Sequence, residues 1–166
     1  MRAILALLAL AALSACGLKP MYAGSGGQAV AQGLAEVEVA PIPGQDGWLV
    51  RNALNDRLQV TGQRSAPRYR LEVQLDDSLE ALGVLNDDTI SRERRILRAR
   101  YQLVDVASGT ILLDATAGSD AGIDVVSSEY ATIAAEQTAL ENLARDVAER
   151  MARRIALRLR EAGQPE

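Results

Sequence analysis

The chain has 166 residues, a formal net charge of −4 and an apolar fraction of 48%, which together suit one globular domain with a real core. This weak negative charge excludes the general basic surface of a nucleic-acid-binding protein, so we expect no nucleic acid as a partner. The chain has no histidine and one cysteine, which excludes histidine-based catalytic triads, histidine metal ligands and a thiolate zinc site. We therefore expect no metal and no cofactor.

The first sixteen residues, MRAILALLALAALSAC, join one positive charge at Arg2 to an apolar run over 3–13. Eleven apolar residues are too few for a membrane-spanning helix, which needs about 20, but they suit the hydrophobic region of a secretory signal. The segment Leu13-Ser14-Ala15-Cys16 resembles the bacterial lipobox, in which the cysteine thiol is acylated before cleavage makes it the first residue. The alternative is an ordinary secretory signal that contains an unrelated cysteine.

The lipobox predicts an organisation for the whole chain. Residues 1–15 form the signal peptide, and Cys16 carries the lipid. A lipidated cysteine and a flexible, glycine-rich tether occupy 16–33, a domain occupies 34–162, and 163–166 form a tail. Gly17 stands where an aspartate would resemble the enterobacterial signal for inner-membrane retention, so we expect lipid anchoring to the outer membrane, on its periplasmic side.

The first half of the domain predicts one strand and one helix. Residues 36–42 alternate and then meet Pro41 and Pro43, which predicts a short strand. A helix is expected from Asp46, as its cap, to about Val60, ended by Thr61-Gly62. Its apolar residues at helical spacing are Val50, Ala53, Leu54 and Leu58.

Three strands follow, predicted over 68–76, about 89–106, and from Ile111 onward after a turn at 107–110. Apolar and polar side chains alternate along them, as in an antiparallel sheet with one covered face. In the third strand the residues expected to face inward are Ile111, Leu113 and Ala115.

A long amphipathic helix is expected from Glu129 to about Leu159, with Ser128 as its cap. Acidic residues precede basic ones by four positions at Glu141–Arg145, Asp146–Arg150 and Glu149–Arg153. Its apolar stripe comprises Ile133, Leu140, Leu143, Val147, Met151, Ile155 and Leu159. We therefore predict an α/β two-layer sandwich, in which two helices pack on one face of a mainly antiparallel four-stranded sheet in the order β-α-β-β-β-α.

Three stretches resemble the LptE family of lipopolysaccharide-assembly lipoproteins in its alphaproteobacterial form. Cys16-Gly17-Leu18-Lys19-Pro20-Met21-Tyr22 is similar to the start of the mature family sequence. Arg68-Tyr69-Arg70-Leu71 and Arg100-Tyr101-Gln102-Leu103-Val104-Asp105 resemble its central strands, and Ser128-Glu129-Tyr130-Ala131 with Ala148-Glu149-Arg150-Met151 resembles its last helix. The resemblance implies a non-catalytic protein that sits in the lumen of the outer-membrane β-barrel LptD, assists its assembly and binds lipopolysaccharide.

The densest cluster of positive charge is the predicted ligand site, because arginine can grip phosphates and carboxylates with two parallel hydrogen bonds. Its members are Arg92, Arg94, Arg95, Arg98 and Arg100, of which the first three lie nearest the loop. The alternative is an exposed sheet face on which these arginines pair with Glu93, Glu72 and Asp76 across strands.

A loop predicted over 78–86 carries apolar residues where a turn is normally polar. Its apolar members, Leu82, Val84 and Leu85, are candidates for contact with a barrel wall or an acyl chain. The loop could equally fold back on the core.

Two other functions compete with lipopolysaccharide assembly. A lipoprotein subunit of an ABC-type lipid transporter would also combine a lipobox with a small α/β domain, and would associate with an inner-membrane permease instead of an outer-membrane barrel. A periplasmic hydrolase is disfavoured, because the chain lacks histidine and a nucleophile elbow.

We expect Cys16→Ala to leave an uncleaved or mis-sorted precursor, because the lipid-accepting thiol is lost, while the domain from about Leu34 onward still folds. Metabolic labelling with a fatty acid tests this. Persistent labelling of the variant would show that the lipid is attached elsewhere.

Overall fold

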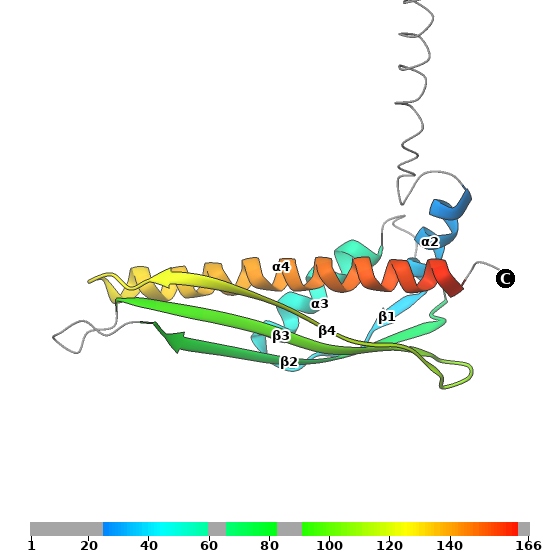
Figure 1. The fold of residues 1–166 in the computed structure, drawn as a ribbon, viewed down its shortest axis with the longest axis horizontal. Helices are drawn as coiled ribbons and strands as arrows, with labels where there is room; N and C mark the ends of the chain where they lie inside the picture. The colour runs from blue at the N-terminus through cyan, green and yellow to red at the C-terminus, as the bar shows by residue number, and fades with distance from the viewer. Residues whose placement is uncertain (1–24, 60–65, 83–90, 163–166) are drawn as a thin grey trace, which may run out of the picture.

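The computed structural model describes residues 25–59, 66–82 and 91–162. Its elements follow the predicted order, preceded by one further helix (Figure 1). They are α2 (Ser25–Ala35), β1 (Val37–Val39), α3 (Gly44–Leu58), β2 (Tyr69–Ala81), β3 (Arg92–Asp105), β4 (Ile111–Asp124) and α4 (Glu129–Ala162). Within these ranges no helix is long and apolar enough to cross a membrane.

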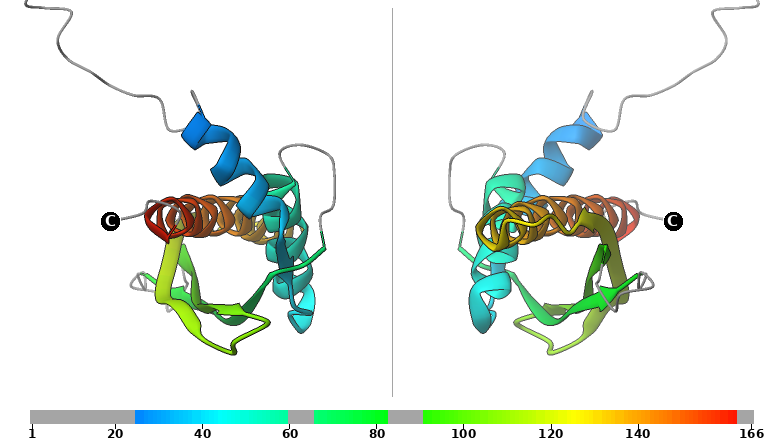
Figure 2. Two further views of the ribbon diagram at one scale, coloured as in Figure 1. Left: turned by 90° about the vertical axis from the view of Figure 1, so that its right-hand side faces the viewer. Right: turned by 90° about the vertical axis from the view of Figure 1, so that its left-hand side faces the viewer.

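The four strands form one sheet in the order β1-β2-β3-β4. β1 is parallel to β2, while β2, β3 and β4 form an antiparallel meander. Figure 2 shows the sheet curled into a trough, with α4 along its open side and α3 beside it. The predicted α/β sandwich with a mainly antiparallel four-stranded sheet is therefore confirmed.

The core lies between the helices and the inner face of the sheet. From α4 it takes Leu140, Leu143, Val147, Met151 and Ile155, all at most 2% exposed, at three- and four-residue spacing. The sheet contributes Leu71, Leu97, Ala99, Tyr101 and Leu103, and α3 contributes Val50, Ala53, Leu54 and Leu58. These core residues recur as the sequence predicts, about every 3.6 residues in the helices and every second residue in the strands.

The tether predicted to extend to residue 33 is corrected by α2, which begins at Ser25. Val30 and Leu34 lie one helical turn apart and are buried. Gly33 brings α2 close to the C-terminal end of α4, since a Cβ at this position would lie 3.4 Å from Leu159 Cδ1. Gly33, one of the residues that suggested a flexible segment, instead lies at a helix–helix contact.

Two predicted core residues are exposed, and each has a local reason. Ile111 is 52% exposed, because the β3–β4 register shifts between Leu103 and Val104 and puts Leu113 opposite Leu103. Ile133 is 56% exposed and lies in the second turn of α4, beyond the main run of core residues. Leu113 packs against the core as predicted.

Two helix caps were predicted, and only one is present. Ser128 caps α4 as predicted, since its Oγ accepts a hydrogen bond from the Ala131 amide at 3.4 Å. Asp46 does not cap α3: the helix begins at Gly44 after Pro43, and Asp46 lies in the first turn. A carboxylate there still favours the positive end of the helix dipole.

Two arginines of α4 contact the sheet, and most of the acid–base pairs predicted within this helix do not form. Only the Arg153–Glu149 pair of the three forms, at 3.6 Å. Arg150 Nη1 donates to the Gly118 carbonyl of β4 at 2.8 Å, and Arg158 Nε donates to the Leu112 carbonyl at 2.7 Å. These bonds fasten α4 along the outer edge of β4.

Val147→Asp is expected to unfold the domain, because it would place an unpaired carboxylate at a fully buried position between α4 and the sheet. Leu143→Asp should act in the same way. Glu141→Ala, at an exposed position of α4, should lower the free energy of unfolding by less than about 0.5 kcal/mol. Denaturant melts measure all three, and a larger loss at Glu141 than at Val147 would contradict the assigned faces of α4.

Candidate functional site

The alternation of β3 divides the predicted arginine cluster between the two faces of the sheet. Arg92, Arg94, Arg98 and Arg100 lie on the outer face, which is turned away from α4. Arg95 lies on the inner face, where its Nη1 donates to the Glu136 carbonyl of α4 at 3.1 Å.

Arg95 is held by a two-pronged ion pair with Asp77 of β2. Its Nε and Nη2 lie 2.9 and 2.6 Å from the two carboxylate oxygens, and both side chains are largely buried. These hydrogen bonds raise the pKa of the Arg95 guanidinium, against the opposing effect of burial. Arg95 thus joins β2, β3 and α4, and the candidate outer-face site does not include it.

Three of the four outer-face arginines pair with aspartates of β4. Arg92 Nε lies 3.3 Å from the carboxylate of its cross-strand neighbour Asp124. The other two pairs are diagonal: Arg94 with Asp120 and Arg100 with Asp114, each at 3.1 Å. The sequence alternative correctly foresaw cross-strand pairing, but its partners Glu93, Glu72 and Asp76 were wrong.

The pair nearest the centre of the sheet is reinforced by a third side chain. Gln102 Nε2 also donates to Asp114, at 2.8 Å. Hydrogen bonds from Arg100 and Gln102 hold the pKa of the Asp114 carboxyl below its usual range. The same contact raises the pKa of Arg100. Arg100 is therefore already committed to a partner within the sheet.

Arg98 differs from its neighbours because it faces Gly118 across the β3–β4 ladder, where β4 has no side chain. Among residues 25–59, 66–82 and 91–162, no carboxylate lies within ion-pair distance of the Arg98 guanidinium. Asp76 is its direct neighbour on β2, but the two form no ion pair. Arg98 is therefore the outer-face arginine whose charge is least committed.

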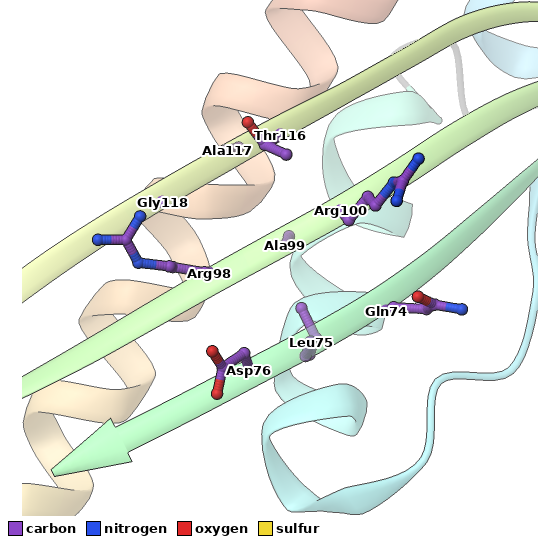
Figure 3. A pocket seen from close by; sticks show the side chains of 9 residues that line it. All are labelled: Gln74, Leu75, Asp76, Arg98, Ala99, Arg100, Thr116, Ala117 and Gly118. Atoms are coloured by element: carbon purple, nitrogen blue, oxygen red, sulfur yellow. The ribbon is translucent and has the colours of Figure 1, made fainter.

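A hollow of about 400 Å³ lies beside Arg98 on this face (Figure 3). The side chains of Gln74, Asp76, Arg98, Arg100 and Thr116 border it, and Gly118 leaves it open toward β4. Arginine, amide and hydroxyl groups there could donate hydrogen bonds to an anionic or sugar-bearing ligand. The sequence prediction did not include Thr116 and Gly118 in the site. Gly118 could have indicated it, because a glycine inside a strand often marks a place where another group approaches the backbone closely.

The predicted apolar loop is only partly described. Residues 78–81 continue β2, and so belong to a strand where a loop was expected. Leu82 is 44% exposed at the end of that strand. Val84, Leu85 and Cys16 lie outside the described residues. The described residues contain no group of acidic or cysteine side chains suited to hold a metal ion.

Known structures share this fold. A lipoprotein from Caulobacter crescentus CB15 is 24% identical, with a TM-score of 0.65 over 82% of this chain and 98% of its own. A minor lipoprotein from Acinetobacter baumannii is 17% identical, with a TM-score of 0.57 over 74% of this chain and 92% of its own. Rare lipoprotein B from Shewanella oneidensis is 10% identical, with a TM-score of 0.56 over 76% of this chain and 100% of its own. At these identities the likeness concerns the fold alone.

None of the curated protein sequences matches this chain. The model of the family described as "LptE: Lipopolysaccharide-assembly" matches residues 34–155, which include β1, α3, the whole β2–β4 meander and most of α4. The chain therefore belongs to the LptE family of lipopolysaccharide-assembly lipoproteins.

Proposed function

We propose that this lipoprotein binds lipopolysaccharide on the outer face of its sheet and acts as plug and assembly partner of the LptD β-barrel, anchored in the outer membrane through Cys16. The observation that carries the ligand site is the Arg98 guanidinium, which has no ion-pair partner among the described residues and borders the hollow. Lipid A phosphates and inner-core carboxylates are its expected ligands.

The neighbouring arginines can take part at little cost. The Arg92–Asp124 and Arg94–Asp120 pairs are exposed, and exposed pairs contribute only about 0.2–1 kcal/mol each. A phosphate can therefore displace the aspartates, because it accepts charge-assisted hydrogen bonds from two arginines at once. Arg98 needs no such exchange of partners. The proposed site thus centres on Arg98, flanked by Arg92, Arg94 and Arg100.

The polarity of the sheet supports the plug function. The outer faces of β2 and β3 carry Arg70, Glu72, Gln74, Asp76, Arg98, Arg100 and Gln102. The lumen of an outer-membrane barrel is itself polar, so a domain that fills it needs such a surface. In contrast, an enzyme would require a reactive group in a pocket, and the hollow beside Arg98 has neither a nucleophile–base pair nor a metal cluster among the described side chains.

Arg98→Ala is expected to weaken lipopolysaccharide binding by the mature protein by about 1.5–3 kcal/mol for each charge-assisted bond lost, and to flatten its salt dependence. The double variant Arg92→Ala/Arg94→Ala should show the same trend, with a smaller loss per residue, because the native aspartate pairs are given up on binding. Titration with purified lipopolysaccharide at low and high salt measures both effects.

Arg145→Ala is the matched control, since Arg145 is an exposed arginine of α4 that contacts its own helix. The affinity of the Arg145→Ala variant for lipopolysaccharide, and its salt dependence, should equal those of the unmodified protein. Unchanged binding by the Arg98 and Arg92/Arg94 variants, with unaltered denaturant melts, would contradict the proposed ligand site.

Affinity purification of the lipidated protein from outer membranes is expected to recover a large β-barrel protein. Recovery with an inner-membrane permease instead would favour the alternative, a lipoprotein subunit of an ABC-type lipid transporter. The substitution Val147→Asp serves as a control, because an unfolded domain should lose its partner in either case.

A further inference from the structure

The hydrogen-bonding pattern of the sheet determines which backbone groups of β2 face its outer edge. The Arg68 carbonyl accepts from the Val106 amide, and the Leu82 amide donates to the Arg92 carbonyl. Both contacts join even-numbered residues of this segment to β3. Because antiparallel residues alternate between the two sides of a strand, the odd-numbered residues of β2 direct their N–H and C=O groups away from β3. β1 uses this edge, since the Ala40 amide donates to the Leu71 carbonyl.

The pairing of β1 with β2 ends early. β1 has three residues, whose partners on β2 are residues 69–71. The chain then passes through Pro41 and Pro43, and a proline has no N–H to offer to a ladder. β2 itself continues to Ala81. In the part of the chain that the structure describes, no backbone group pairs with this edge beyond Leu71.

The opposite edge of the sheet, formed by β4, is covered by α4. The outward carbonyls of Gly118 and Leu112 on β4 accept hydrogen bonds from Arg150 and Arg158 of α4. An exposed edge is a template for another strand, and natural proteins usually cover it or place charges along it. This fold therefore covers the β4 edge with a helix. On β2 the last residues extend past the N-terminal end of α3 (Figures 1 and 3).

We propose that the β2 edge from Asp77 to Ala81 binds an extended segment of another protein as an added strand. Its odd-numbered residues would supply the backbone hydrogen bonds, as in strand addition to other sheets. The added segment would carry basic side chains on the outer face, beside Asp76 and Glu80, and apolar side chains on the inner face, beside Leu79. This interaction uses the backbone edge of β2, whereas ligand binding is proposed on the outer face around Arg98; Asp76 borders both.

The charges along β2 specify this occupant. Asp76 and Glu80 point outward, and neither belongs to an ion pair among the described residues. Leu79 points inward and is still 46% exposed, so it can pack against an apolar neighbour. A second copy of this chain would bring the same carboxylates onto one face, and like charges on adjacent strands destabilise the pairing. The acidic edge thus disfavours self-association and favours a basic strand.

A labelled nine-residue peptide of alternating lysine and valine is the probe, with the full mature protein in detergent micelles. We expect saturable binding, and at least a tenfold slowing of amide hydrogen exchange at Asp77, Leu79 and Ala81. The amides of Ser78 and Glu80 already bond to β3, so their exchange should change little. A peptide with the same residues in shuffled order should bind at least tenfold more weakly.

Two variants test the edge directly. Leu79→Pro removes an N–H that faces the edge and none that bonds to β3, so it should fold and lose at least tenfold in peptide affinity. Asp76→Lys/Glu80→Lys should also lose at least tenfold in peptide affinity. Glu129→Lys/Glu141→Lys on α4 changes the net charge by the same amount and should bind the peptide as tightly as the unmodified protein does.

The proposal would be overturned by equal binding of the ordered and shuffled peptides, by unchanged exchange at the edge amides of the unmodified protein, or by full affinity in the Asp76/Glu80 variant. A dimer in sedimentation that disappears in Leu79→Pro would identify a second copy as the occupant, and would also overturn it.

Discussion

The structure depends on the burial of one apolar stripe of α4 against the concave face of the sheet. Leu143, Val147, Met151 and Ile155 are at most 2% exposed, and β3 meets them with side chains that are just as buried. Burying each large apolar side chain stabilises the fold by about 1.5–3 kcal/mol. A single helix can cover three strands only if the sheet curls toward it, which produces the trough in Figure 2. The curl brings β4 beside α4, where Arg150 and Arg158 reach its free carbonyls.

This use of the inner face leaves the outer face of the sheet, and the β2 edge beyond Leu71, free of other elements in the described part of the chain. On the outer face, aspartates of β4 neutralise most of the arginines of β3, so the surface is strongly polar without a strong net charge. The series of arginine–aspartate pairs between β3 and β4 is interrupted at Gly118, which faces Arg98 and has no side chain. Arg98 lies there beside the hollow. The proposed ligand site would therefore be defined less by the number of arginines than by Arg98, which has no ion-pair partner among the described residues.

Periodicity in the sequence predicted the fold well, because each long element buries one face. The errors arose where a contact between residues distant in the sequence determines the local structure. Val30 was predicted to belong to the tether over 16–33, because a short segment rich in glycine and alanine shows little helical preference without α4 to pack against. Ile111 followed the expected alternation until the shift in register at Val104 turned it outward. No local pattern reports either event.

The arginine cluster shows the same limit for the site. The alternation of β3 places Arg92 and Arg94 on one face of the sheet and Arg95 on the other. The sequence could not identify their partners, because β2 and β4 both offer carboxylates and only the register chooses between them. The pairing of Arg95 with Asp77 follows from that choice, and so does the position of Arg98, which has no ion-pair partner within the ranges that the structure describes.

Helix α2 also bears on how the proposed lipid anchor would orient the domain. It packs against the C-terminal end of α4 through Gly33, and the segment between Cys16 and Ser25 spans at most about 30 Å when fully extended. α4 has 34 residues and is about 50 Å long, and the last residues of β2 lie near its other end (Figure 1). With a lipid on Cys16, the membrane would hold the end of the domain that contains α2. The free edge of β2 would then lie at the opposite end, where a short tether leaves it accessible to a partner in the periplasm or in the barrel lumen.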